Sequence, residues 1–298
     1  MRMPRVRNRA NLRQRCDSGP LGFVQVAALP ADSRTDDAGH QLPAVPRKLD
    51  RLRLPTENPR MAARKKTAPA TMDAPAVLAL LKEHSSKKTL DGMAHFGIPS
   101  DNALGVPMST MQKLAKGIGK SHTLAAALWK TGCYEARILA CLVDEPEEVT
   151  SAQMDRWARE FGNWAVCDSA CFHLFNRSPL ALEKIPQWAA SDDEFVKRGA
   201  FALLACIPAK DAAAQKALAA MLPLVESAAD DDRNFVKKGV SWALRRVGQR
   251  SASLHAAALE LARRLEASGV KSARWIGKDA IKDLTRPLVL KKLTTAKR

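Results

Sequence analysis

Trp164 and Asp168 are the residues of this sequence whose types and spacing best suit a chemical step. They lie in an apolar segment, residues 161–171, and are four residues apart. Residues with this spacing share one face of a helix, so an indole ring and a carboxylate should lie side by side. Burying a carboxylate among apolar neighbours is costly unless it has a partner. A helix cap or a bond to an arginine would also explain Asp168, and the sequence leaves these alternatives open.

A second pattern repeats along the chain. Phe195-Val196-Lys197-Arg198 and Phe235-Val236-Lys237-Lys238 lie forty residues apart, and the segments 275–278 and 134–137 also place a base three residues after an aromatic residue. A period near forty is typical of stacked helical pairs. We predict that the basic residues on or near this pattern form a track that binds phosphates; they are Arg137, Lys197, Arg198, Lys237, Lys238, Arg245, Arg246 and Lys278.

Simpler interpretations exist for both members of the repeated pattern. The aromatic members, Tyr134, Phe195, Phe235 and Trp275, would most simply pack between helices. The bases could instead pair with the acidic runs 192–194 and 230–232, which also suit helix starts because the helix dipole favours acids there. An acid such as Asp168 beside a basic track repels phosphate, so its presence favours chemistry on a bound nucleic acid.

The periodicity of apolar residues predicts an all-α protein of about a dozen helices, with no alternating strand run. A loop is expected at 97–107. Stacked helical pairs form an α-solenoid with an extended concave surface, and residues repeated in each pair should line that surface. The predicted helices include 124–129, 135–143, 151–161, 163–175, 185–190, 194–206, 212–228, 234–247, 253–267 and 273–284.

The charge of the chain points to an acidic partner. Its 298 residues carry a formal net charge of +17, with a pI near 9.9. Residues 1–70 hold 15 Lys and Arg against 6 Asp and Glu, so the remainder is basic but less so. An excess of this size most often indicates nucleic acid as the partner. The 46% hydrophobic content allows an ordinary globular core.

The N-terminal region differs from the rest in composition. Residues 1–72 are rich in Pro and Arg and lack sustained apolar periodicity, which predicts disorder. Met61, followed by Ala-Ala-Arg-Lys-Lys, resembles an alternative translation start. We therefore expect a basic extension at 1–72, a helical domain at 73–292 and a flexible tail at 293–298. Neither a signal peptide nor a membrane span is recognisable, so a cytoplasmic location, in the cytosol or nucleoid of a bacterium, is expected.

Several other functions have little support in the sequence. The six cysteines form no CxxC pair, and Cys167, Cys171 and His173 lack the spacing of a zinc module, so reduced thiols and no metal are expected. Gly119-Lys120-Ser121 resembles the end of a phosphate-binding loop, but Leu114 occupies the position of the required first glycine. The histidines form neither HExxH nor a triad-like group.

The ordered series of motifs resembles the AlkD-like DNA alkylation repair glycosylases, which are solenoids of HEAT-like repeats. The resemblance covers roughly residues 75–290. The motifs that carry it are Gly105-Val106-Pro107-Met108, Leu128-Trp129, Glu135-Ala136-Arg137, the segment 161–171, Phe195-Val196-Lys197-Arg198, Lys237-Lys238 and Trp242-Ala243-Leu244-Arg245.

This resemblance implies a right-handed solenoid that excises cationic N7- or N3-alkylated purines from duplex DNA, acting as a monomer without metal or organic cofactor. Asp168 would stabilise positive charge on the deoxyribose and orient water. Trp164 and Trp242 would pack against the backbone and sugar of the lesion nucleotide, and Arg198 would hold the phosphodiester. Ala165, Gly199 and Gly239 depart from what relatives or a good helix would have.

Two other functions remain open at this point. One is a protein that binds DNA structures without excising bases, in which Asp168 is structural. The other, less favoured by the basic residues, is a scaffold that holds a protein or peptide on its concave surface.

Overall fold

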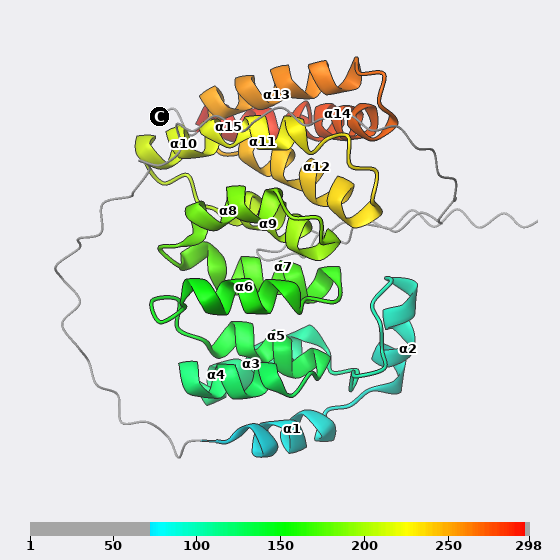
Figure 1. Ribbon diagram of the computed structural model, residues 1–298, viewed down its shortest axis with the longest axis vertical. Coiled ribbons are helices and arrows are strands. Elements are labelled where there is room, and N and C mark those ends of the chain that lie inside the picture. The colour runs from blue at the N-terminus through cyan, green and yellow to red at the C-terminus, as the bar shows by residue number, and fades with distance from the viewer. Residues whose placement is uncertain (1–71, 296–298) are drawn as a thin grey trace, which may run out of the picture. The chain divides into compact units, whose positions relative to one another are not determined.

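The computed structural model describes residues 72–295, which belong to one unit of the chain and whose regular elements are all helices (Figure 1). The all-α prediction is therefore confirmed. The helices are α1 (Ala74–Glu83), α2 (Lys87–His95), α3 (Met108–Ile118), α4 (His122–Lys130), α5 (Tyr134–Val143), α6 (Ser151–Arg159), α7 (Trp164–His173), the 3₁₀ helix η2 (Phe175–Arg177), α8 (Ala181–Ala189), α9 (Glu194–Cys206), α10 (Ala212–Ala220), α11 (Leu222–Ser227), α12 (Asn234–Gly248), α13 (Ala252–Glu266), α14 (Lys271–Leu284) and α15 (Pro287–Thr295).

Short polar side chains fix where many of these helices begin. Each cap accepts a hydrogen bond from a backbone N–H of the first turn, which has no partner within the helix. Asn163 caps α7 by accepting from Ala165 and Val166, and Asp193 does the same at α9 for Phe195 and Val196. The other side-chain caps are Asp73, Ser86, Ser121, Thr150, Asp211 and Ser251. The loops therefore set the register of the helices that carry the candidate site.

Five helices contact one another in succession and form what we call the central row: α5, α7, α9, α12 and α14. Outside this row, α4 packs on α5, α8 on α9, α11 on α12 and α13 on α14, and Figure 1 shows these layers following one another in chain order. This is the arrangement of an α-solenoid, as the forty-residue period predicts. The handedness of the superhelix and a concave basic surface stay predictions.

The described region contains more helices than the dozen expected, fifteen α-helices in all. Residues 212–228 form two helices, α10 and α11, because the chain breaks at Met221 and Pro223 starts the second one. Proline lacks the N–H that a continuing helix needs, and it suits a first turn. The predicted helix 163–175 likewise ends at His173 and passes into η2. The loop expected at 97–107 is present between α2 and α3.

Aromatic side chains form the centre of the main core. The rings of Trp129 and Trp157 stack with centroids 3.9 Å apart, and Phe161, Phe175 and Trp188 surround them. Such rings bury large apolar areas, so they dominate packing energy. Gly199 has a packing reason, because a Cβ there would lie 3.1 Å from the Phe161 ring. At Gly239 the nearest contact of a Cβ would be an ordinary 3.4 Å, so packing does not require that glycine.

No helix within residues 72–295 has the length and apolar character needed to cross a membrane.

Burial raises the pKa of the thiols of Cys141, Cys171 and Cys206, and the described cysteines are free thiols. The same part of the chain holds no group of three His, Cys, Asp or Glu side chains arranged to bind a metal ion. Residues 1–71 of the predicted extension at 1–72, which include Met61 and Cys16, lie outside the described residues, as do residues 296–298.

The contact between α13 and α14 depends on the absence of a side chain at Gly277. A Cβ there would lie 2.3 Å from the Glu266 nitrogen and 2.5 Å from the Ala262 carbonyl oxygen. We therefore expect Gly277→Ala to lower the free energy of unfolding by about 1–3 kcal/mol, the usual cost of overpacking. Urea denaturation measures this change.

The control is Gly117→Ala on α3, where a Cβ would meet nothing within 4 Å. Because alanine favours a helix over glycine, this variant should be neutral or slightly stabilised. Equal stability of the two variants would contradict the close approach of α13 and α14.

Candidate functional site

Asp168 and Arg198 form a buried ion pair between two helices of the central row. Asp168 lies on α7 and Arg198 on α9. Arg198 Nε donates to Asp168 Oδ1 at 2.9 Å, and its Nη2 donates to Oδ2 at 2.8 Å. The side chain of Asp168 is 12% exposed and that of Arg198 is 7% exposed. Of the alternatives that the sequence left open, the bond to an arginine is the one present.

The pair also reaches a third helix. Arg198 Nη1 donates to the carbonyl of Phe235 in the first turn of α12, at 2.8 Å. A guanidinium has five N–H donors, so these three bonds leave one N–H on each of Nη1 and Nη2. A carboxylate has about four lone-pair positions, so Asp168 also keeps acceptor capacity. The pair therefore joins α7, α9 and α12, and both side chains keep hydrogen-bonding capacity that these contacts do not use.

Burial and pairing oppose each other in the titration of this pair. Burial raises the pKa of the Asp168 carboxyl, and the charge and hydrogen bonds of Arg198 act to lower it. Asp168 in turn raises the pKa of Arg198 against the effect of burial. Because a guanidinium does not lose its proton in proteins and bidentate pairing favours the carboxylate, the pair is ionic at neutral pH.

Trp164 lies at the start of α7, where the segment after α2 covers it. Its indole N–H donates to the Phe96 carbonyl at 2.9 Å. Trp164 and Phe96 also pack against a small cluster of buried side chains, Met93, Ile98 and Ala165, which is separate from the main core. This explains the small residue at position 165, since an acidic side chain there would be buried against Met93 and Ile98. The helical spacing that placed Trp164 and Asp168 on one face is present.

Trp242 lies on α12, two helices further along the central row from Trp164. Its side chain is half-buried and packs against the main core. The two tryptophans therefore belong to helices on either side of α9, which carries Arg198. Among the described residues, the rings of Trp164 and Trp242 do not pack against each other.

Several bases of the predicted phosphate track have protein partners. The Arg137 guanidinium donates to the backbone carbonyl of Glu160 at 2.7 Å and to the Glu160 carboxylate at 3.2 Å. Lys197 pairs with Asp231 at 3.2 Å, and Arg245 pairs with Asp279 at 3.2 Å. Arg246 donates to the Gln249 side chain at 3.0 Å. The simpler interpretation, pairing with the acidic run 230–232, therefore holds for Lys197, while the other bases use different partners.

Three lysines of the predicted track have no carboxylate partner within residues 72–295. Lys238 is half-buried, and its pKa is lowered by burial and by the charges of Arg198 and Lys237. The ammonium of Lys237 lies 5.4 Å from the centre of the Trp275 ring. Lys278 is exposed on α14. These lysines are the ones whose charge is most available to an anionic ligand.

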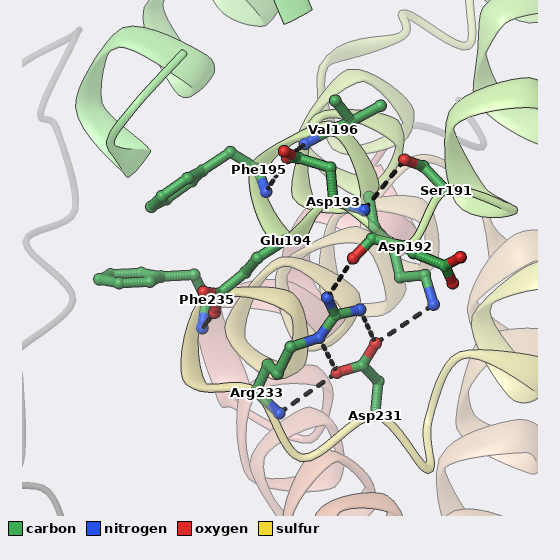
Figure 2. Close-up of polar contacts among 10 residues, drawn as sticks. Ser191, Asp192, Asp193, Glu194, Phe195, Val196, Asp231, Arg233 and Phe235 are labelled. Carbon is green, nitrogen blue, oxygen red and sulfur yellow. Dashed lines mark hydrogen bonds and ion pairs between the residues drawn. The ribbon is translucent and has the colours of Figure 1, made fainter. Parts of the chain in front are cut away.

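The repeated aromatic residues differ from one another in their surroundings. Figure 2 shows the rings of Phe195 and Phe235 on the same side of the helix starts, and their centroids lie 5.2 Å apart. Packing between helices is therefore correct for this pair, and Tyr134 is half-buried as well. Trp275 is 38% exposed, so that interpretation is wrong for this position. The Lys237 ammonium on α12 lies over the Trp275 ring.

A polar network fixes the loops at the starts of α9 and α12 (Figure 2). Arg233 forms two hydrogen bonds to the Asp231 carboxylate, at 2.9 and 2.6 Å, and donates to the Asp192 carbonyl at 2.6 Å. Glu194 accepts from the Phe235 N–H at 3.1 Å. The network holds the two helix starts side by side, and the Phe235 carbonyl that meets Arg198 belongs to this region.

Glu135, which belongs to the motif Glu135-Ala136-Arg137, holds the loop between α2 and α3. It is fully buried on α5 and accepts hydrogen bonds from the backbone N–H groups of Leu104, Gly105 and Val106 at 2.9, 2.7 and 3.2 Å. Gly105 (φ 76°) lies so close to α2 that a Cβ would come within 2.4 Å of the Ser86 carbonyl oxygen. The available sequence signal was an acid at the start of the apolar helix 135–143.

Removing the guanidinium of Arg198 should strongly destabilise the fold. In Arg198→Ala the Asp168 carboxylate is left buried without a counterion, which typically costs about 3–5 kcal/mol of unfolding free energy. Urea denaturation at neutral pH measures the loss. The double variant Asp168→Asn/Arg198→Ala should recover part of it, because the unpaired charge is gone.

Arg264→Ala is the matched control, since the ion pairs of Arg264 with Glu226 and Glu260 are exposed. Such pairs contribute about 0–1 kcal/mol. A loss at Arg198 no greater than that at Arg264 would contradict the structural importance of the buried pair.

Comparison with known proteins places this geometry in a family. The family model described as "DNA alkylation repair enzyme" matches residues 77–284. A solved structure described as "A new family of proteins related to the HEAT-like repeat DNA glycosylases with affinity for branched DNA structures" has 21% sequence identity and a TM-score of 0.64, and the match covers 74% of this chain and 96% of that one. No curated protein sequence is significantly similar. The structural likeness supports the α-solenoid fold, and the extent of the family match shows that this chain belongs to the DNA alkylation repair enzyme family.

Proposed function

We propose that this protein is a DNA glycosylase that removes cationic N7- or N3-alkylated purines from duplex DNA. The observation that carries the proposal is the Asp168–Arg198 pair, which joins a carboxylate and a guanidinium on the helix row that also bears Trp164 and Trp242. A carboxylate serves a reaction that develops positive charge, and a guanidinium serves a substrate with phosphates. Both requirements meet in excision of a base from DNA.

The reaction needs only water besides the DNA. The bond between the sugar C1′ and the alkylated base breaks, and the base leaves as a neutral molecule with the bonding electrons because it began as a cation. Positive charge gathers on the deoxyribose, and water then attacks C1′ and releases a proton. Asp168 stabilises the sugar cation electrostatically and accepts a hydrogen bond from the incoming water.

Pairing with Arg198 suits Asp168 to this role. The guanidinium keeps the carboxylate ionised despite burial and fixes its orientation through two hydrogen bonds. The lone-pair positions that Arg198 does not use remain for the sugar and water. The two remaining N–H donors of Arg198 can hold the phosphodiester next to that sugar. Arg198 is thus anchored by Asp168 and the Phe235 carbonyl, while Asp168 remains a hydrogen-bond acceptor.

The tryptophans and lysines supply contacts to the rest of the nucleotide. Trp164 and Trp242 would pack against the sugar and backbone of the lesion, where an aromatic face also favours a cationic base. Lys237, Lys238 and Lys278 would contact phosphates, because no carboxylate neutralises them within the described part of the chain. The protein would act as a monomer in the cytosol or nucleoid of a bacterium.

A second candidate is binding of a particular DNA structure without excision. Both oxygens of Asp168 already bond Arg198, and the side chain is largely buried, as in a purely structural ion pair. The related solved structure is described as having affinity for branched DNA. In this case the helix row would present lysines and aromatic rings to DNA while Asp168 only held the helices together.

Asp168→Asn separates the two candidates. Removing the negative charge should reduce release of 7-methylguanine and 3-methyladenine from methylated duplex DNA by roughly a hundredfold or more, the scale of losing one electrostatic group from a reaction centre. Binding of the same duplex should be retained or improved, since a charge that repels phosphate is gone. Chromatography of the released bases provides the measurement.

Asp155→Asn is the control, because Asp155 pairs with Lys184 and Trp188 away from the central row. It should excise normally. Thermal unfolding of both variants separates a loss of chemistry from a loss of fold. Absence of release by the unmodified protein, together with DNA binding, would favour the second candidate.

Salt dependence tests the contact of Lys238 with phosphate. If Lys238 neutralises one phosphate, Lys238→Ala should reduce the slope of log K against log salt by about 0.9. Fluorescence anisotropy with a labelled duplex at several salt concentrations measures the slope. Lys130→Ala, at the exposed end of α4 outside the central row, should leave the slope unchanged. Equal slopes for the two variants would remove Lys238 from the interface.

A further inference from the structure

Phe172 lies on the same face of α7 as Trp164 and Asp168. The three residues follow one another at intervals of four along the helix. Four residues turn a helix by about 40° beyond one full turn and advance it by about 6 Å. Asp168 therefore stands between the two aromatic rings, with Trp164 one turn before it and Phe172 one turn after it.

Phe172 differs from its neighbours on α7 in its exposure. The preceding residues of the helix, Ala165 to Cys171, are buried, whereas Phe172 is 43% exposed. Large exposed apolar side chains in the described region are few, and the aromatic ones are Phe172 and Trp275. Both lie on helices of the central row; the exposed aliphatic side chains are Met72 before α1, Val270 at the N-cap of α14, and Leu288 and Leu290 on α15. Exposed rings thus occur on the helices that carry the candidate site.

Basic side chains surround the end of α7 beyond Phe172. The Arg177 guanidinium donates to the carbonyl of His173, and Lys120 donates to the carbonyls of Leu142 and Asp144 at 2.8 and 2.7 Å. Burial and the charges of Arg177 and Lys120 lower the pKa of His173 to about 4, so its ring is neutral at pH 7. Asp144, Glu145 and Glu147 partly offset the charge of Lys120. Arg177 is exposed and forms no ion pair with a described residue.

We propose that Phe172 is a further DNA-contacting residue, whose ring stacks on a nucleobase or sugar one helical turn beyond Asp168 while Arg177 meets a neighbouring phosphate. The proposal rests on the function proposed above. A flat apolar ring next to a cation matches a nucleic-acid strand, which presents aromatic bases and a regular line of phosphates. A protein partner would explain the exposed ring but not its register with Asp168.

The test is binding of a fluorescein-labelled methylated duplex by the full chain and its variants, followed by fluorescence anisotropy. Stacking on one base typically accounts for about tenfold in affinity or more, so Phe172→Ala should bind about tenfold more weakly. The salt slope should not change, because no charge is removed. Phe172→Trp should bind within about twofold of the unmodified protein, since stacking is retained, whereas Phe172→Leu should behave like the alanine variant.

Leu290→Ala is the matched control, because Leu290 is also 43% exposed but lies on α15 outside the central row. It should bind as the unmodified protein does. Since Phe172 is exposed, its variants should also retain the thermal unfolding temperature of the unmodified protein.

Two results would overturn the inference. If the unmodified protein binds the duplex and Phe172→Ala or Phe172→Leu binds equally well, Phe172 does not stack on DNA, and the proposed glycosylase function is unaffected. If the unmodified protein does not bind the duplex at all, the proposed function fails together with the role of Phe172.

Discussion

A charged pair in an apolar interior is the interaction on which the central row depends. Each ion alone would be costly to bury, and together they remain acceptable only because the two hydrogen bonds are well aligned. Asp168 and Arg198 therefore restrict how α7 and α9 can slide or rotate against each other, and the third bond of Arg198 extends this restriction to α12. Apolar packing between these helices supplies more of the burial but is less specific about register. The same two side chains are the ones best suited to meet DNA, so here the stability of the fold and the proposed chemistry cannot be varied independently.

Charge is distributed along the row less simply than a line of bases suggests. Arg137, Lys197 and Arg245 form ion pairs with Glu160, Asp231 and Asp279, respectively. Lys238 and Lys278 have no such carboxylate partner among the described residues. Paired bases still contribute to the field at a distance, but they offer less to a phosphate in direct contact, because a new bond must compete with an existing one. More than half of the formal excess charge of the chain lies in residues 1–70, outside the described region. The field of the helical region is therefore modest, and close contacts must contribute more of any specificity.

Much of the fold could be predicted from the sequence because it depends on local patterns. Helical periodicity gave the elements, and the forty-residue spacing of Phe195 and Phe235 correctly indicated that the two positions are equivalent, since their rings pack together. Errors arose where a local break or a distant partner decided the outcome. Pro223 divided a continuous apolar stretch, and Trp275 is exposed beside Lys237, unlike the packed rings of Phe195 and Phe235 at the equivalent positions. Pairing of Asp168 with Arg198 joins residues thirty positions apart, and periodicity carries no information on which arginine a buried acid will choose. The cover over Trp164 was missed for the same reason, because its partner is a backbone carbonyl.

The hydrogen bond from Trp164 to Phe96 has a consequence for motion in the molecule. It connects positions 68 residues apart, and together with the small cluster around Met93 it attaches α2 to the central row. Regions with few buried apolar contacts open at a lower free energy than the core that they cover. The α2 segment is therefore the part of the candidate site whose backbone amides would exchange with solvent through local opening, without unfolding of the remaining helices. A ligand that contacts both Trp164 and this segment would bind with an affinity reduced by the conformational entropy lost when the segment is held closed. The order of α2 and the affinity for that ligand are therefore thermodynamically linked.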